Sequence, residues 1–130
     1  MRLTALLLVL LPLPAVSDTL MTAAEFDAFV TGRVLDFTLD GEVWGTEQYK
    51  ANRRVKWAFT AAECKEGIWY DQGDQICFLY EDPNDPQCWY FYKTDSGVSV
   101  RFAADPEGTP MSTVTESPGP LGCPGPDVGV

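Results

Sequence analysis

The chain has 130 residues, no histidine and a formal net charge of −10 at pH 7, with 19 acidic against 9 basic residues. So acidic a surface excludes a binder of nucleic acid or of anionic membranes, because either binder needs cations that face phosphate groups. The absence of histidine also excludes the Ser–His and Cys–His pairs of nucleophilic catalysis.

Residues 1–17 have the pattern of a secretory signal peptide. Arg2 supplies the positive start, residues 3–13 form an apolar run too short to span a bilayer, and small residues occupy the positions that signal peptidase reads. We expect cleavage between Ser17 and Asp18, which makes the protein periplasmic or secreted and leaves it without a membrane anchor. An uncleaved anchor is the alternative.

A short amphipathic helix is predicted next, over residues 22–31. Thr22 and Glu25 have the spacing of a capping box, in which each side chain accepts from the backbone N–H of the other residue. The apolar residues of one helical face follow: Phe26, Phe29 and Val30. We expect this face to pack on the domain or to plug an opening.

After the helix, apolar and polar residues alternate, which is typical of strands. Asp40-Gly41 and Gly73-Asp74 are signals of tight hairpin turns. The predicted strands lie in the segments RVLDFTLDGEVWG, which turns at Asp40-Gly41, RRVKWAFT, GIWYDQ, QICFLYE, QCWYFYK, VSVRFAA and STVTE. Short connections favour pairing between successive strands. We therefore predict a mainly β fold, an antiparallel up-and-down meander of seven or eight strands that closes into a small barrel, with a two-layer sandwich as the alternative.

The predicted organisation is one domain and a tail. The barrel with its helix takes residues 18–117, and residues 118–130 form a tail rich in proline and glycine. Four cysteines in a short exported chain predict two disulfides. The pairing Cys77–Cys88 with Cys64–Cys123 is favoured, because the first bridge would close a hairpin and the second would pin the tail. Cys64–Cys77 with Cys88–Cys123 is the close alternative.

Residues 67–92, GIWYDQGDQICFLYEDPNDPQCWYFY, contain half of the aromatic residues of the chain. A turn at Gly73-Asp74 would place Trp69 opposite Phe78 and Tyr70 opposite Cys77. The simpler interpretation is that the aromatic residues fill the core of a small barrel. The sharper hypothesis is that some of them line an open cavity for an apolar or aromatic ligand. Its candidate residues are Trp44, Trp57, Trp69, Phe78 and Trp89.

No pattern in the sequence predicts an enzyme, a metal or a cofactor. Pairs of carboxylates lie at predicted turns, where solvent would keep them from acting as a buried general acid. Oxygen donors gather in the loop that holds Glu81, Asp82, Asn84 and Asp85, and they could hold a weak calcium ion. We favour a polar turn there, bent by Pro83 and Pro86, so catalytic residues, metal ligands and cofactors are all predicted to be none.

Residues 49–91 resemble a group of short exported alphaproteobacterial proteins of unknown function. The shared signature is an Arg-Arg-x-x-Trp strand followed by Cys-x-x-Gly-x-Trp-Tyr, Ile-Cys-Phe-x-Tyr and Cys-Trp. Here these motifs start at Arg53, Cys64, Ile76 and Cys88. The resemblance implies no activity. The group is also distantly similar to lipocalin-like small barrels, and this similarity concerns the fold and not the function.

Three functions follow as hypotheses. The first is a periplasmic binding module for a small apolar or aromatic ligand. The second is an acidic partner of a basic secreted enzyme, similar to the small periplasmic barrels that inhibit lysozyme, because strong negative charge speeds association with a cationic protein. The third is an envelope accessory protein that binds no ligand.

Overall fold

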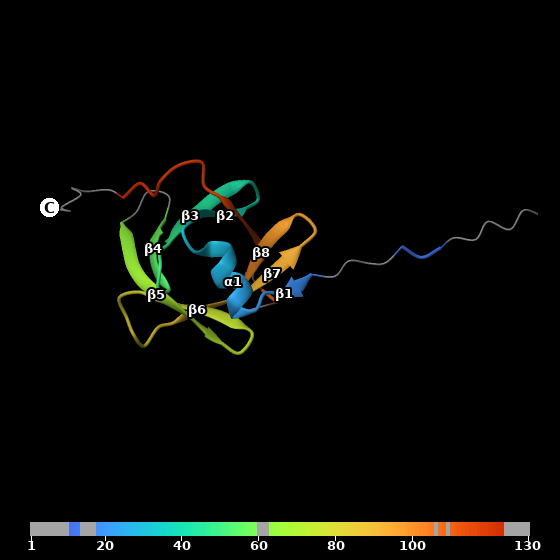
Figure 1. The fold of residues 1–130 in the computed structure, drawn as a ribbon, viewed down its shortest axis with the longest axis horizontal. Coiled ribbons are helices and arrows are strands. Elements are labelled where there is room, and N and C mark those ends of the chain that lie inside the picture. Colours follow the sequence, from blue (N-terminus) through green and yellow to red (C-terminus); the bar gives the residue numbers. More distant parts are fainter. Residues whose placement is uncertain (1–10, 14–17, 60–62, 106, 109, 124–130) are drawn as a thin grey trace, which may run out of the picture.

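The computed structural model describes residues 11–13, 18–59, 63–105, 107–108 and 110–123 (Figure 1). The predicted leader lies mostly outside these residues, so cleavage between Ser17 and Asp18 stays a prediction. Leu11 and Leu13, which the structure describes, are exposed. Within the described ranges, no helix has the length and apolar character needed to cross a membrane.

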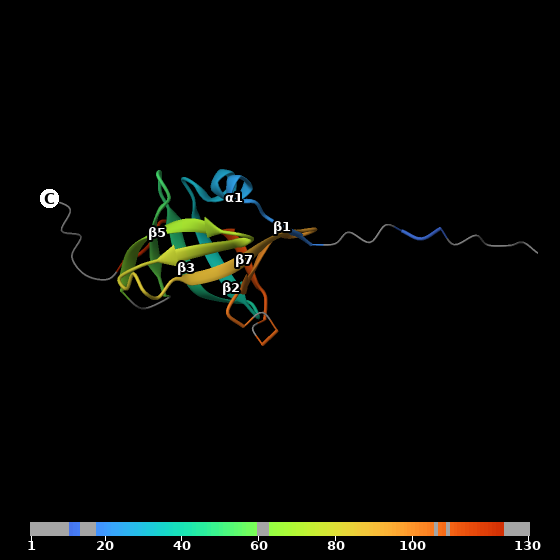
Figure 2. The ribbon, with the colours of Figure 1, turned by 90° about the horizontal axis from the view of Figure 1, so that it is seen from below.

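Eight antiparallel strands form a closed barrel, as predicted (Figures 1 and 2). Each strand pairs with the next along the chain, and the last pairs with the first, where Leu35 faces Glu116. The strands are β2 (Val34–Leu39), β3 (Glu42–Tyr49), β4 (Arg54–Ala58), β5 (Cys64–Gln72), β6 (Gln75–Leu79), β7 (Gln87–Thr94), β8 (Gly97–Phe102) and β9 (Ser112–Glu116). Closure removes the free edges that an open meander would expose.

A ninth strand, β1 (Thr19–Leu20), lies outside the barrel ring and was not predicted. It pairs with the end of β7, where Leu20 faces Tyr92. On the same edge of β7, β6 pairs with the beginning of the strand, for example Ile76 with Trp89. The N-terminal segment therefore covers the part of the β7 edge that the shorter β6 leaves open.

A β-bulge interrupts the hairpin of β2 and β3. The hairpin turns at Asp40 and Gly41, which have φ values of 50° and 80° and thus the left-handed conformation that a tight hairpin turn requires. Beyond the turn, Thr38 pairs with Val43 but Phe37 pairs with Gly45, so Trp44 is skipped. Such a bulge re-aims the side chains of its strand.

Helix α1 (Ala23–Val30) covers one opening of the barrel (Figures 1 and 2). Its N-terminus carries the predicted capping box of Thr22 and Glu25, and Glu25 also pairs with Lys93 of β7. Phe26 is fully buried and meets four aromatic rings of the barrel: Tyr49, Trp69, Phe78 and Phe91. The helix therefore plugs this end.

Two disulfides connect the chain, Cys64–Cys123 and Cys77–Cys88. This is the pairing favoured from the sequence. The second joins directly opposed residues of β6 and β7, and the first attaches the segment after β9 to the start of β5. Two disulfides fit an oxidising compartment outside the cytoplasm.

Candidate ligand-binding cavity

The barrel contains a cavity of about 320 Å³, which is at the lower end of the range typical of small-molecule sites, roughly 300–1,000 Å³. Tyr49, Phe78 and Phe91 line it, and the same three rings contact Phe26. These rings therefore form a floor between the cavity and α1. The rim comes from the segments that follow β4 and β6, which include Phe59 and Asp82.

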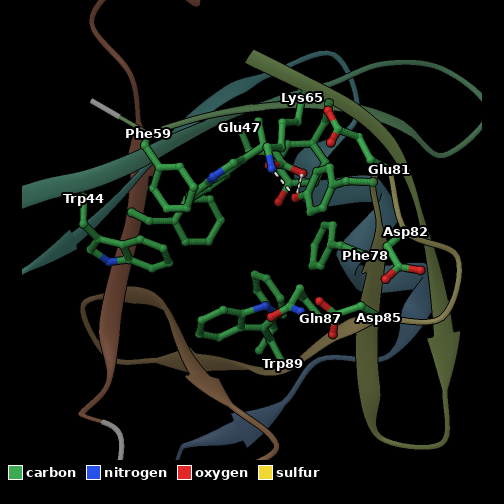
Figure 3. Close-up of a pocket in the computed structure, with 15 residues that line it drawn as sticks. Trp44, Glu47, Phe59, Lys65, Phe78, Glu81, Asp82, Asp85, Gln87 and Trp89 are labelled. Carbon is green, nitrogen blue, oxygen red and sulfur yellow. Dashed lines mark hydrogen bonds between the residues drawn. The ribbon is translucent and has the colours of Figure 1, made fainter. Parts of the chain in front are cut away.

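Three tryptophans from three strands, Trp44, Trp57 and Trp89, form part of the wall, and Figure 3 shows Trp44 and Trp89 there. The ring of Trp44 lies 5.3 Å from that of Trp57 and 5.9 Å from that of Trp89, centroid to centroid. Its indole N–H donates to the hydroxyl of Ser112 at 2.9 Å, which fixes the ring in this position. Trp44 shares the inward position opposite Phe37 with Gly45, because the two residues of a bulge face a single residue of the partner strand.

Four of the five candidate residues meet at this cavity: Trp44, Trp57, Phe78 and Trp89. The prediction for Trp69 is corrected. Trp69 faces the interior, but its ring lies 4.9 Å from that of Phe26 and Arg53 lies over it at 4.2 Å. It belongs to the packed end beneath α1, because the helix fills the opening that would otherwise have exposed its ring.

Glu47 of β3 is a buried carboxyl in the cavity lining, with 1% of its surface exposed. The hydroxyl of Tyr80 donates to both of its oxygens, at 3.1 Å each. Burial raises the pKa of Glu47 well above its ordinary value because desolvation disfavours the charged form, and the hydrogen bond from Tyr80 opposes this effect. Burial and the nearby Glu47 likewise raise the pKa of Tyr80.

A second polar group at the cavity is unsatisfied. The hydroxyl of Tyr49 is buried and has no hydrogen-bond partner among the described residues. Burial, followed by the charge of Glu47, raises its pKa well above the ordinary value. Because buried hydroxyls normally have partners, the orphaned group marks a place for a water molecule or for a polar atom of a ligand.

The rim of the cavity carries most of its charge. Glu81, Asp82 and Asp85 are exposed in the loop between β6 and β7, while Lys65 of β5 is half-buried (Figure 3). The loop is a polar turn, as favoured from the sequence: the backbone N–H of Asn84 donates to the carboxylate of Asp82 at 2.9 Å. No cluster suited to a metal ion occurs among the described residues.

Five polar residues of the cavity lining were not among the candidates from the sequence: Glu47, Tyr49, Lys65, Tyr80 and Gln87. Glycine inside a strand is a known sign of a bulge, and Gly45 was the available signal. Counted from the Asp40-Gly41 turn without a bulge, Glu47 would point outward. The bulge at Trp44 shifts the alternation by one residue and turns Glu47 inward, where it faces Leu35 and Trp57 across the neighbouring strands.

Comparison with known proteins adds no relative: no family model, no curated protein and no solved structure matches this chain. The arrangement is a closed barrel with a plug at one end and an aromatic cavity that holds a buried carboxyl. What this site can do must therefore be argued from its own chemistry.

Proposed function

We propose that this protein is a non-enzymatic binding module for a small ligand with an apolar or aromatic body. One observation carries the proposal: Trp44, Trp57 and Trp89, which contact one another through Trp44, together line a cavity of about 320 Å³ inside the barrel. The ring surfaces that face the cavity lack van der Waals contacts with other protein atoms, and a ligand would supply those contacts. The few polar groups among the apolar walls, Glu47 and the hydroxyl of Tyr49, would orient such a ligand.

Its place of action, in this proposal, is the periplasm or the extracellular space. The predicted leader, residues 1–17, would direct the chain to export, and the two disulfides fit an oxidising compartment. A disulfide-stapled barrel around a preformed cavity would bind without folding on its ligand, which keeps the entropic cost of binding low.

The test is a titration of the oxidised protein, residues 18–130, with N-phenyl-1-naphthylamine, an uncharged dye whose emission rises in dry surroundings. We expect saturable binding and a melting temperature that increases with dye concentration. Trp89→Ala should weaken binding by about tenfold, since an aromatic wall residue contributes on the order of 1–3 kcal/mol. Tyr92→Ala is the matched control, because the alternation of β7 places Tyr92 on the face opposite Trp89 and Phe91.

A folded protein that binds no dye, or variants that bind it equally, would overturn the proposal. The acidic rim would then favour the alternative of a partner for a basic secreted enzyme, since Glu81, Asp82 and Asp85 are exposed together. That alternative has its own assay: lysozyme activity at low salt with the protein in excess, where unchanged activity rules out inhibition of this enzyme.

A further inference from the structure

The cavity has an excess of negative charge. Four acidic side chains line it, Glu47, Glu81, Asp82 and Asp85, against the single basic side chain of Lys65, counted over the described lining residues. The whole chain carries a net charge of −10, so the field outside the cavity has the same sign. Such a field concentrates cations and repels anions at the mouth of a cleft.

Among the described residues, Glu47 has no cationic partner. The ion pairs of the described residues join Lys50 with Glu66, Arg53 with Asp71 and Lys93 with Glu25, all away from Glu47. A buried carboxyl must either hold a proton or find a counter-ion, because an unpaired buried charge is costly. Its two oxygens receive one donor, the hydroxyl of Tyr80, which leaves acceptor capacity for another.

The tryptophan faces of the cavity are also free of the protein's own cations. Within the described chain, Arg33 lies over Phe29 and Arg53 over Trp69, both outside the cavity lining. Tryptophan is the best aromatic partner for a cation, and rings that surround a cation on several sides are typical of sites for organic ammonium groups. Trp44, Trp57 and Trp89 come from three strands and line the same cavity as Glu47. Figure 3 shows Trp44 and Trp89 on its wall.

We propose that the cavity binds a small organic cation, whose aromatic or alkyl body packs among the three tryptophans while its ammonium group pairs with the carboxylate of Glu47. This inference rests on the proposed function and narrows its ligand class. The ammonium group supplies the counter-ion that Glu47 lacks. The orphaned hydroxyl of Tyr49 would serve as a second polar contact inside the site.

Three probes that share a phenyl ring and differ in charge test this class: benzyltrimethylammonium, benzyl alcohol and benzoate, each measured by displacement of the neutral dye. We expect the cation to bind about tenfold more tightly than the alcohol, as an ion pair and a cation–ring contact allow, and benzoate to bind most weakly. Glu47→Gln keeps the shape of the side chain and removes its charge. This variant should lower the affinity for the cation by about tenfold and change the affinity for the alcohol by no more than about twofold.

Glu116→Gln is the matched control, because Glu116 is exposed on β9 and its change removes the same charge from outside the cavity. It should leave all three affinities unchanged. Equal affinity for the cation and the alcohol, or a preference for benzoate, would overturn the proposal that the ligand is a cation. If the dye still binds in that case, the proposed function stands. Failure of every probe, the dye included, would overturn both.

Proton linkage gives a second readout that a purely structural role of Glu47 would not move. Benzyltrimethylammonium does not titrate, so its affinity should rise by up to about tenfold per pH unit below the pKa of Glu47 and level off above it. The other titratable groups that line the cavity are Tyr49 on β3, Lys65 on β5, Tyr80 after β6, and Glu81, Asp82 and Asp85 on the rim, and Tyr80 is the one that hydrogen-bonds this carboxyl. In Glu47→Gln, the affinity for the cation should no longer depend on pH. A pH dependence that persists in this variant would come from the rim carboxylates and would contradict the role of Glu47.

Discussion

Tyr80 and Glu47 form a hydrogen-bonded pair inside the barrel: the phenolic hydroxyl donates to both carboxylate oxygens, at 3.1 Å each. The partners come from different parts of the ring, since Glu47 lies on β3 and Tyr80 directly follows β6. Tyr80 in turn stacks on Phe78, with ring planes 9° apart. The buried carboxyl is thus held at the cavity wall by a side chain that is itself fixed by packing.

Glu47→Gln should remove a pH dependence of stability. Burial raises the pKa of Glu47 above the ordinary value of 4.5, so the folded protein holds this proton more tightly than the unfolded chain. The resulting stabilisation is complete below about pH 4.5 and is lost as the pH rises through the raised pKa. Melting curves from about pH 4 to about pH 9 should show the wild type losing stability relative to the variant. Parallel curves would mean that the carboxyl titrates as in the unfolded chain.

Tyr80→Phe should destabilise the fold because it leaves the carboxyl of Glu47 buried without a donor. The expected loss is about 1–3 kcal/mol in free energy of unfolding, measured with urea at neutral pH. In a Glu47→Gln background the same change should cost less, since a neutral amide suffers less from a missing partner. An equal loss in both backgrounds would show that the hydroxyl stabilises the fold independently of the charge of Glu47, and no loss in either would show that Tyr80 acts through ring packing alone. Tyr92→Phe, on the outer face of β7, is the control.

Gly45→Ala should destabilise the barrel through a clash. A methyl group at position 45 would overlap the ring of Trp57, which packs directly on the glycine backbone. Overpacking of this kind costs about 1–3 kcal/mol, and displacement of Trp57 would also deform the cavity. The free energy of unfolding, measured with urea, and the affinity for the dye should therefore both decrease. Gly119→Ala, where a methyl group has no neighbour within 4 Å, should change neither.

Removal of the disulfides should cost several kcal/mol each. On the chain-entropy model, the bridge Cys77–Cys88 with its separation of 11 residues contributes about 3 kcal/mol, and Cys64–Cys123 with its separation of 59 contributes about 4 kcal/mol. Paired Cys→Ser variants and calorimetry with and without reductant measure these terms. A melting temperature that does not change on reduction would contradict a stabilising role for the bridges.

Local chemistry made much of the fold predictable. The Gly73-Asp74 turn set the register of the central hairpin, in which Trp69 faces Phe78 and Tyr70 faces Cys77 as expected. In the separate register of β6 with β7, Cys77 lies opposite Cys88, and the favoured disulfide pairing is the one found. The capping box of Thr22 and Glu25 likewise predicted where α1 begins.

The site was harder to predict because it depends on events outside a local window. Trp69 and Phe78 share an inward face, but only the docking of Phe26 decides which end of that face is filled. The inward position of Glu47 depends on a one-residue bulge beside Gly45, and alternation cannot reveal such a shift. Tertiary packing and backbone irregularity thus determine the cavity, whereas turns and alternation determine the barrel.

The pairing of β2 with β9 has a kinetic consequence. It brings Leu35 to Glu116, so the ring closes only after nearly the whole chain is available. Contacts between such distant residues raise the contact order and slow the folding of a small domain, because chain entropy is lost before the contact forms. A nascent chain that lacks its last strand would expose the edges of β2 and β8 together. Truncation before Ser112 should therefore yield an aggregation-prone open sheet instead of a smaller barrel.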